Sequence, residues 1–277
     1  MFRLDGRTAL ITGGGGGLGA AIADLFTQAG ARVVVAGRRR FAGELPSVTF
    51  DITNDRQVAS GIAQARGLLG GRIDILVNSA GILTEATVVE MSPETWAQTL
   101  AVDLTGVFLT CRHVVPEMVE RRWGRIINVA SQLGIKGGHS MSHYAAAKAG
   151  VIAFTKSLAL EVSAHNVLAN TIAPGPCETK MVAGLTEEWK NAKMRELPLA
   201  TGGTAPISRS RTIPPELAAA NDSTRTPNRS SRCRVAATAP LSAKTNVPSR
   251  LAISIGSVVM TGCPVARAFD SGLERYP

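Results

Sequence analysis

The sequence Arg7-Thr-Ala-Leu-Ile-Thr-Gly-Gly-Gly-Gly-Gly-Leu-Gly19 joins a short apolar segment to a run of glycines. Its first six residues are typical of a buried β-strand, and the helix-forming segment Ala20–Gln28 follows the glycines directly. Glycines let a backbone approach a pyrophosphate, and a helix start supplies free N–H groups and a positive dipole end. A flexible glycine linker is the alternative, but linkers seldom separate a buried strand from an amphipathic helix. The stretch therefore predicts a phosphate-binding turn.

Outward from this turn, apolar segments that resemble strands alternate with longer helical segments. Such alternation is typical of a doubly wound parallel sheet, in which the ligand binds at the carboxyl ends of the strands. We therefore predict an α/β fold of Rossmann type with three α/β/α layers. Further strands are expected at residues 31–36, 48–50, 73–78, 125–130 and 167–173, and helices at about 55–69, 92–121, 144–160 and 179–195.

The second strand is followed by Gly37-Arg38-Arg39-Arg40. A site for NAD usually has Asp or Glu at this point, where it binds the ribose hydroxyls. Here Arg38 follows a glycine, and a guanidinium suits a 2′-phosphate. The turn predicts that NADP(H) is preferred, with NAD(H) still possible. The alternative is an ordinary basic turn at the surface.

A second group of polar residues surrounds the start of the long helix at 144–160. Ser131 follows the fifth strand, and Tyr144 and Lys148 are four residues apart on the helix, which places them on one face. A phenol with a pKa of about 10 is a poor base at neutral pH, but a nearby cation lowers that pKa by about 1–3 units. We expect Lys148 and an oxidised nicotinamide ring to act in this way. Tyr-x-x-x-Lys also occurs by chance on exposed helices, so it indicates a catalytic site only in combination with the other motifs of the chain.

Five motifs together resemble the short-chain dehydrogenase/reductase family, near its 3-oxoacyl-(acyl-carrier-protein) reductases. The motifs are Thr12-Gly13-x-x-x-Gly17-Leu18-Gly19, Asn78-Ser79-Ala80-Gly81, Ser131, Tyr144-x-x-x-Lys148 and Pro174-Gly175. The resemblance covers residues 1–199. It implies a Rossmann-like fold that binds NAD(P)(H), interconversion of a carbonyl and an alcohol by hydride transfer, and a homo-oligomer, usually a tetramer.

The resemblance also implies a role for each matching residue. Tyr144 corresponds to the catalytic acid/base, Ser131 to the residue that orients the substrate oxygen, and Lys148 to the residue that lowers the tyrosine pKa and binds the nicotinamide ribose. The implied cofactor-binding residues are Thr12, Gly13, Gly17, Leu18, Gly19, Arg38, Asp51, Ile52, Asn78, Ala80, Gly81, Tyr144, Lys148, Pro174, Gly175, Cys177 and Thr179.

One catalytic position departs from the family pattern. The family usually has Asn in a Val-Asn-Leu segment, and this chain has Val102-Asp103-Leu104. An ionised aspartate accepts hydrogen bonds from Lys148 or a water but cannot donate them as an amide does. We interpret Asp103 as a tolerated fourth member of the catalytic set.

Composition narrows the class of protein. The hydrophobic content of 45% and charged content of 18% are ordinary for a soluble protein, and the four cysteines show no metal-ligand spacing, so no metal site is predicted. No signal peptide or membrane span is evident, and the expected location is the cytosol. Residues 1–199 carry a net charge of +3 and residues 200–277 a net charge of +6, without an aromatic-interleaved basic patch. We predict a small-molecule carbonyl or alcohol substrate and no binding to nucleic acid or membrane.

The sequence changes character after residue 199, so we predict two parts: a catalytic domain at 1–199 and a basic, Ser/Thr/Pro-rich tail at 200–277. The tail contains eight of the fourteen prolines and no sustained helical or strand period. We expect it to be poorly ordered and to lack the family's last parallel strand. This change in composition after residue 199 is compatible both with a shift of reading frame and with a divergent natural tail. Two alternative functions follow: a cofactor-binding protein with impaired catalysis, and an interaction protein that acts through its tail.

Overall fold

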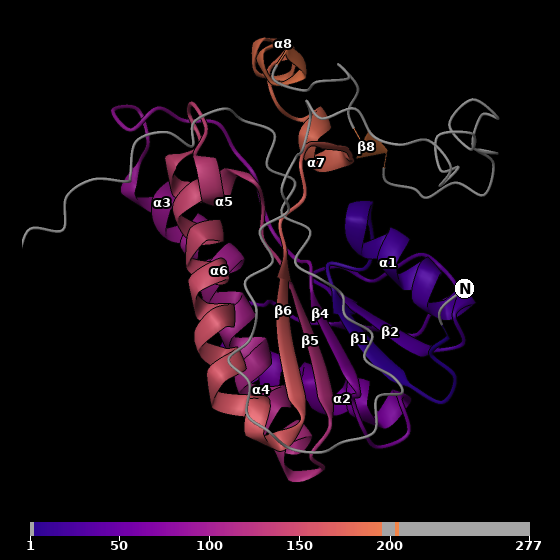
Figure 1. Ribbon diagram of the computed structural model, residues 1–277. Helices are drawn as coiled ribbons and strands as arrows, with labels where there is room; N and C mark the ends of the chain where they lie inside the picture. The colour runs from indigo at the N-terminus through magenta and orange to yellow at the C-terminus, as the bar shows by residue number, and fades with distance from the viewer. Residues whose placement is uncertain (1–2, 196–202, 205–277) are drawn as a thin grey trace, which may run out of the picture. The chain divides into compact units, whose positions relative to one another are not determined.

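The computed structural model describes residues 3–195 and 203–204. Its core is a sheet of six parallel strands in the order β3-β2-β1-β4-β5-β6 (Figure 1). This order reverses between β1 and β4, as in a Rossmann-like doubly wound sheet, and confirms the predicted fold class. The strand bounds are Thr8–Thr12 for β1, Arg32–Gly37 for β2, Ser47–Thr49 for β3, Ile75–Asn78 for β4, Gly124–Val129 for β5 and Val167–Ile172 for β6.

Helices cover both faces of this sheet and complete three layers. On one face, α1 (Gly17–Gln28) packs Ala23 and Phe26 against residues of β1, β2 and β4. On the other face, α2 (Asp55–Leu68), α4 (Gly106–Glu120) and α6 (Ser142–Val162) form the larger core with the opposite side chains of the strands. Successive residues of β1 show the alternation, since Leu10 belongs to the larger core and Ile11 to the smaller one.

The helix predicted at 92–121 is divided into three segments. Ser92 caps α3 (Pro93–Leu100) by accepting a hydrogen bond from the Thr95 N–H, a π-helical turn follows at Ala101–Thr105, and α4 continues the chain. Wider turns of this kind are frequent at functional sites. Here the turn carries Asp103, whose side chain is fully buried.

The segment after β6 also differs from the prediction, which placed one helix at about 179–195. It forms a two-residue strand β7 (Cys177–Glu178) and two helices, α7 (Lys180–Ala183) and α8 (Glu187–Arg195). Gly184 ends the first helix and Thr186 precedes the second, where its Oγ1 accepts a hydrogen bond from the Trp189 N–H over 3.2 Å. A small separate sheet pairs β7 with β8 (Gly203–Thr204). A short α5 (Leu133–Lys136) precedes α6.

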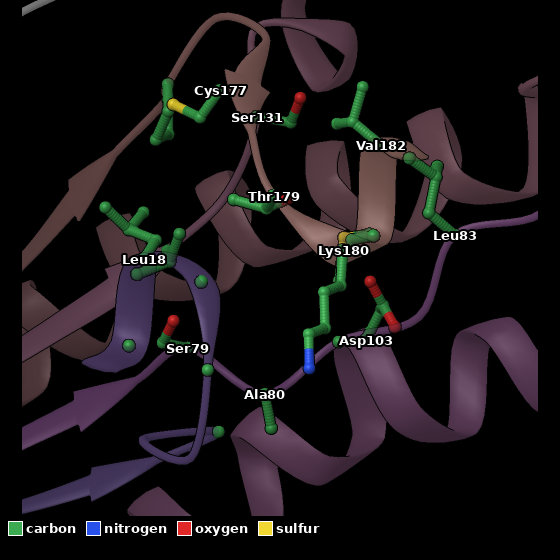
Figure 2. Close-up of a pocket in the computed structure, with 18 of the residues that line it drawn as sticks. Leu18, Ser79, Ala80, Leu83, Asp103, Ser131, Cys177, Thr179, Lys180 and Val182 are labelled. Carbon is green, nitrogen blue, oxygen red and sulfur yellow. The ribbon is translucent and has the colours of Figure 1, made fainter. Parts of the chain in front are cut away.

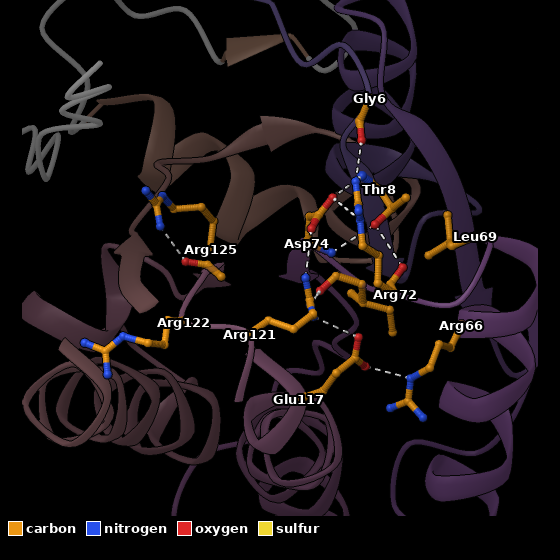
Figure 3. A network of polar contacts seen from close by, with 12 residues as sticks. Gly6, Thr8, Arg66, Leu69, Arg72, Asp74, Glu117, Arg121, Arg122 and Arg125 are labelled. Carbon is orange, nitrogen blue, oxygen red and sulfur yellow. Dashed lines mark hydrogen bonds and ion pairs between the residues drawn. The ribbon is translucent and has the colours of Figure 1, made fainter. Parts of the chain in front are cut away.

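A buried carboxylate ties the amino-terminal edge of the sheet to α4 (Figure 3). The Asp74 side chain is 2% exposed and accepts hydrogen bonds from the Thr8 N–H, Arg72 Nε and Arg121 Nη1. Glu117 connects this group to α2 through an ion pair of 2.7 Å with Arg66. Because the paired charges lie at the edge opposite the glycine turn, we assign this network a structural role, in which removal of one partner would leave a buried charge uncompensated.

Within residues 3–195, no helix is both long and apolar enough to cross a bilayer. The predictions about the tail, including its missing last strand, fall almost wholly on residues 205–277, which lie outside the described residues.

Candidate active site

The glycine turn connects β1 to α1 at the carboxyl edge of the sheet. Gly13 has φ +69°, and a Cβ there would lie 2.7 Å from the Ala80 nitrogen, so only glycine permits this approach to the segment after β4. Thr12 holds that segment in place, because its Oγ1 accepts hydrogen bonds from the N–H groups of Ser79 and Ala80 over 3.2 and 3.3 Å. The turn and residues 79–81 therefore form one floor.

The predicted acid/base residues meet at the start of α6. Tyr144 is the third residue of this helix and Lys148 lies one turn further on. Both side chains are buried, at 8% and 4% exposure, and Lys148 Nζ lies 5.5 Å from the centroid of the Tyr144 ring. Nζ also donates a hydrogen bond of 3.2 Å to the Val129 carbonyl at the end of β5. The i, i+4 spacing thus brings the ammonium close to the phenol, as predicted from the sequence.

Ser131 reaches the same point from the end of β5. Its Oγ accepts a hydrogen bond of 3.1 Å from the Leu133 N–H, and its interaction with the Tyr144 side chain lowers the pKa of that phenol. Gly134 makes this approach possible, since a Cβ on it would lie 2.7 Å from the Ala149 nitrogen of α6. The contact between α5 and α6 therefore places Ser131 beside the phenol.

Asp103 completes the group from the π-helical turn. Its Oδ1 accepts a hydrogen bond of 2.8 Å from the Ile82 N–H, and its Oδ2 lies 3.2 Å from Lys148 Nζ as an ion pair. From the sequence, either Lys148 or a water could be the partner of Asp103, and the structure shows the contact with Lys148. Burial raises the pKa of Asp103, and the Lys148 charge opposes that rise.

The pKa of Tyr144 is raised overall, whereas the sequence predicted that nearby cations would lower it. Burial raises the pKa of the phenol because the charged phenolate loses solvation. The Lys148 charge and the hydrogen bond with Ser131 lower this pKa, as predicted for the lysine, whereas the Asp103 charge raises it. Burial has the largest effect in the protein without cofactor, so the pKa lies above its usual value.

A cavity of about 470 Å³ joins the glycine turn to these four side chains. Figure 2 shows Leu18 and Ala80 on one side of it, with Thr179 and Lys180 facing them from the segment after β6. The predicted site residues that line it are Gly13, Gly17, Leu18, Gly19, Arg38, Ala80, Gly81, Asp103, Ser131, Tyr144, Lys148, Pro174, Gly175, Cys177 and Thr179.

Four predicted cofactor residues do not line this cavity: Thr12, Asp51, Ile52 and Asn78. Thr12 supports the floor from below, and Asn78 is 1% exposed, with its side chain bonded into the core. Ile52 packs beneath Gly106, where a Cβ would come within 2.8 Å of it, and Asp51 binds the Thr53 N–H and hydroxyl. Their roles toward a cofactor stay predictions.

The structure adds lining residues that sequence reasoning did not single out. Arg39 lies beside Arg38, and Lys180, Met181 and Val182 come from α7. Leu83, Leu133 and Trp189 form an apolar wall near Tyr144 with Val182 and the buried Met141 and Leu185. These residues follow no motif, and only the packing of α7 and α8 brings them to the cavity. No group of three or more His, Cys, Asp or Glu suited to a metal occurs in the described part of the chain.

Comparisons with known proteins point to one family. A family model described as short chain dehydrogenase matches residues 7–190. Nodulation protein G of Rhizobium sp. (strain N33) is 39% identical over 214 residues, covering 74% of this chain and 87% of that protein. The 3-oxoacyl-(acyl-carrier-protein) reductase FabG of Aquifex aeolicus (strain VF5) is 35% identical over 216 residues, covering 73% and 87%. A crystal structure titled gox2181 matches with a TM-score of 0.69 and 30% identity, covering 73% of this chain and 85% of that one.

Proposed function

The chain belongs to the short-chain dehydrogenase family of NAD(P)-dependent oxidoreductases, and we propose that it interconverts a carbonyl compound and an alcohol with NADP(H) as the preferred cofactor. The observation that carries this proposal is the burial of Ser131, Tyr144 and Lys148 together at a cavity that continues to the glycine turn. An acid/base group and a dinucleotide site in one cavity are what such a reaction needs.

The glycine turn fits the pyrophosphate of a dinucleotide. Gly16 precedes α1, no side chain caps it within the described residues, and a Cβ on it would meet nothing within 4 Å. The first N–H groups of α1 therefore have room for an anion, and the helix dipole favours negative charge there. We assign the pyrophosphate to residues 13–19 and the nicotinamide end to the region near Lys148 and Thr179. The bound cofactor supplies or accepts the hydride.

Arg38 supports the preference for NADP(H). Its side chain is exposed at the end of β2 and lines the cavity, as Arg39 does. Its charge contributes to lowering the pKa of Asp51, behind the larger effect of the Thr53 hydrogen bonds. A guanidinium here can bind a 2′-phosphate bidentately, which gives strong charge-assisted hydrogen bonds.

In the reducing direction, the Ser131 hydroxyl orients the substrate oxygen by a hydrogen bond, and Tyr144 donates its phenolic proton to that oxygen. In the oxidising direction, the phenolate takes the proton of the alcohol. Lys148 stabilises the phenolate by its charge, and the apolar wall of Leu83, Leu133, Val182 and Trp189 excludes water from the reacting carbonyl.

A screen of ketones and aldehydes with the purified chain tests this function. NADPH consumption, followed by its absorbance, is the expected result for at least one chemical class of carbonyl. Binding of NADPH without turnover of any carbonyl or alcohol would contradict the proposal and favour a cofactor-binding protein with impaired catalysis. Capture of a partner through residues 200–277, unaffected by Tyr144→Phe, would favour an interaction protein.

A further inference from the structure

Asp103 places a fully buried carboxyl group next to the lysine of the acid/base group, and the Lys148 ammonium and the Ile82 N–H favour its ionised form against the burial that raises its pKa. Asp103 is 0% exposed and Lys148 4% exposed, and their charged atoms Oδ2 and Nζ lie 3.2 Å apart. An ammonium and a carboxylate at this distance act on a third group as a dipole, whose field falls off faster than that of a lone charge. Asp103 in place of an asparagine therefore changes how strongly Lys148 stabilises the Tyr144 phenolate.

The carboxylate is held by the segment after β4. The Ile82 N–H holds Oδ1 at 2.8 Å. Gly81 lies against the other oxygen, since a Cβ on Gly81 would come within 3.0 Å of Asp103 Oδ2 and 3.5 Å of Lys148 Nζ. The ion pair is thus fixed from the backbone of the segment after β4 as well as from its own helices.

The charged and titratable groups around Tyr144 come from several elements of the described chain. Lys148 and His143 belong to α6, Asp103 to the π-helical turn, and Lys180 lines the cavity from α7. The His143 ring is fully buried, its Nε2 lies 2.9 Å from Thr84 Oγ1, and burial lowers its pKa. Lys180 is exposed to solvent, so its charge is screened. Asp103 is therefore the buried negative charge that opposes Lys148.

We propose that Asp103 is a positioning residue for Tyr144, whose carboxylate fixes the Lys148 ammonium beside the phenol and offsets the positive charge that would otherwise stabilise the phenolate. An amide at this position would hold Lys148 through its oxygen without cancelling its charge. The direction of the Asp103 effect on the Tyr144 pKa, which is upward, agrees with this geometry.

This inference deepens the proposed function, on which its catalytic consequence rests. Oxidation of an alcohol needs the phenolate, so its rate should rise at a more alkaline pH in the unmodified chain than in the Asp103→Asn variant. Reduction needs the protonated phenol, so its rate should persist to a correspondingly higher pH in the unmodified chain. Asp103 thus favours the reducing direction near neutral pH.

The test is a spectroscopic titration of the tyrosine, which needs no turnover. The sequence has two tyrosines, Tyr144 and Tyr276, so Tyr276→Phe leaves Tyr144 as the single phenol. In this background the ultraviolet absorbance of tyrosinate is followed against pH for the Asp103 protein and for Asp103→Asn, without cofactor. Circular dichroism in the same samples separates ionisation in the folded protein from ionisation by unfolding.

We expect the tyrosinate midpoint of Asp103→Asn to lie below that of the Asp103 protein, and its oxidation rate at neutral pH to be higher by up to about tenfold. An equal or higher midpoint would overturn the proposal. If Asp103→Asn does not fold, Asp103→Ser decides in the same titration, because it also removes the negative charge and an equal or higher midpoint would again overturn the proposal. A lowered midpoint in a protein without any turnover would keep this inference and reject the proposed function.

Discussion

The side chains of Asn78 and Asn128 meet across β4 and β5, where Asn78 Nδ2 donates a hydrogen bond of 2.8 Å to Asn128 Oδ1. Thr110 on α4 donates to Asn78 Oδ1 over 2.7 Å, and Asn128 Nδ2 donates to Thr155 on α6 over 2.8 Å. This chain of hydrogen bonds lies in the core below the cavity floor. It links α4 to α6 through the adjacent strands β4 and β5.

We expect Asn78→Ala to lower the free energy of unfolding by about 1–3 kcal/mol for each buried group that it leaves without a partner. Asn128 Oδ1 and the Thr110 hydroxyl both lose a bond, although the single hydroxyl proton of Thr110 then has the carbonyl of Gly106 or Val107 as an acceptor. Urea unfolding measures the loss. Ser79→Ala is the control, because Ser79 is half-buried and only its backbone bonds Thr12. Equal stability of both variants would contradict this role for Asn78.

We expect Tyr144→Phe to reduce turnover by about 10²–10⁴-fold while NADPH binding survives. The change removes one hydroxyl and leaves the glycine turn and Lys148 in place. Initial rates and a fluorescence titration of the cofactor measure the two effects. Tyr276→Phe is the matched control, since it removes the other phenol of the sequence. A Tyr144→Phe protein that keeps most of its rate would refute the mechanism.

Much of the fold was predictable because its signals are local. The Val/Ile/Leu-rich segments are buried on both faces of a parallel sheet, so they contrast with their surroundings. The glycines at 13–19 and the four-residue spacing of Tyr144 and Lys148 depend on backbone geometry alone. The alternation of strands and helices predicted the doubly wound sheet and a ligand site at the carboxyl ends of its strands.

The remaining features depend on tertiary contacts. Thr12 and Asn78 were predicted to bind the cofactor, but the packing of the core turns their side chains away from the cavity. The hydrophobic pattern of the sequence marks neither the π-helical turn at Asp103 nor the division between α7 and α8. The net rise in the Tyr144 pKa arises from burial, which no spacing reveals. The oligomer and the cytosolic location stay predictions.

We expect NADPH to bind more tightly than NADH, and Arg38→Asp to reverse this preference, because a carboxylate repels the 2′-phosphate and accepts hydrogen bonds from ribose hydroxyls. Titrations of both cofactors measure the ratio. Arg40→Asp is a control of equal charge change, since Arg40 is exposed and does not line the cavity. Tighter binding of NADH than of NADPH by the unmodified chain would show that the interpretation of this turn is wrong. The Arg39→Asp variant shows whether Arg39 also contributes to the preference.

The last prediction concerns alkaline pH and the buried thiol of Cys111. Burial raises its pKa from 9.0 to about 12. A raised folded-state pKa gives stability that is present below the unfolded value and is lost as pH rises toward the folded value. Urea unfolding should therefore show stability falling above about pH 9, by at most about 1.36 kcal/mol per pH unit from this thiol, with Tyr144 adding in the same direction at higher pH. Cys111→Ala should make the fall less steep, whereas Val114→Ala, which removes no titratable group from the same helix, should lower stability equally at every pH. An unchanged slope in Cys111→Ala would show that the thiol ionises as readily in the folded chain as in the unfolded one.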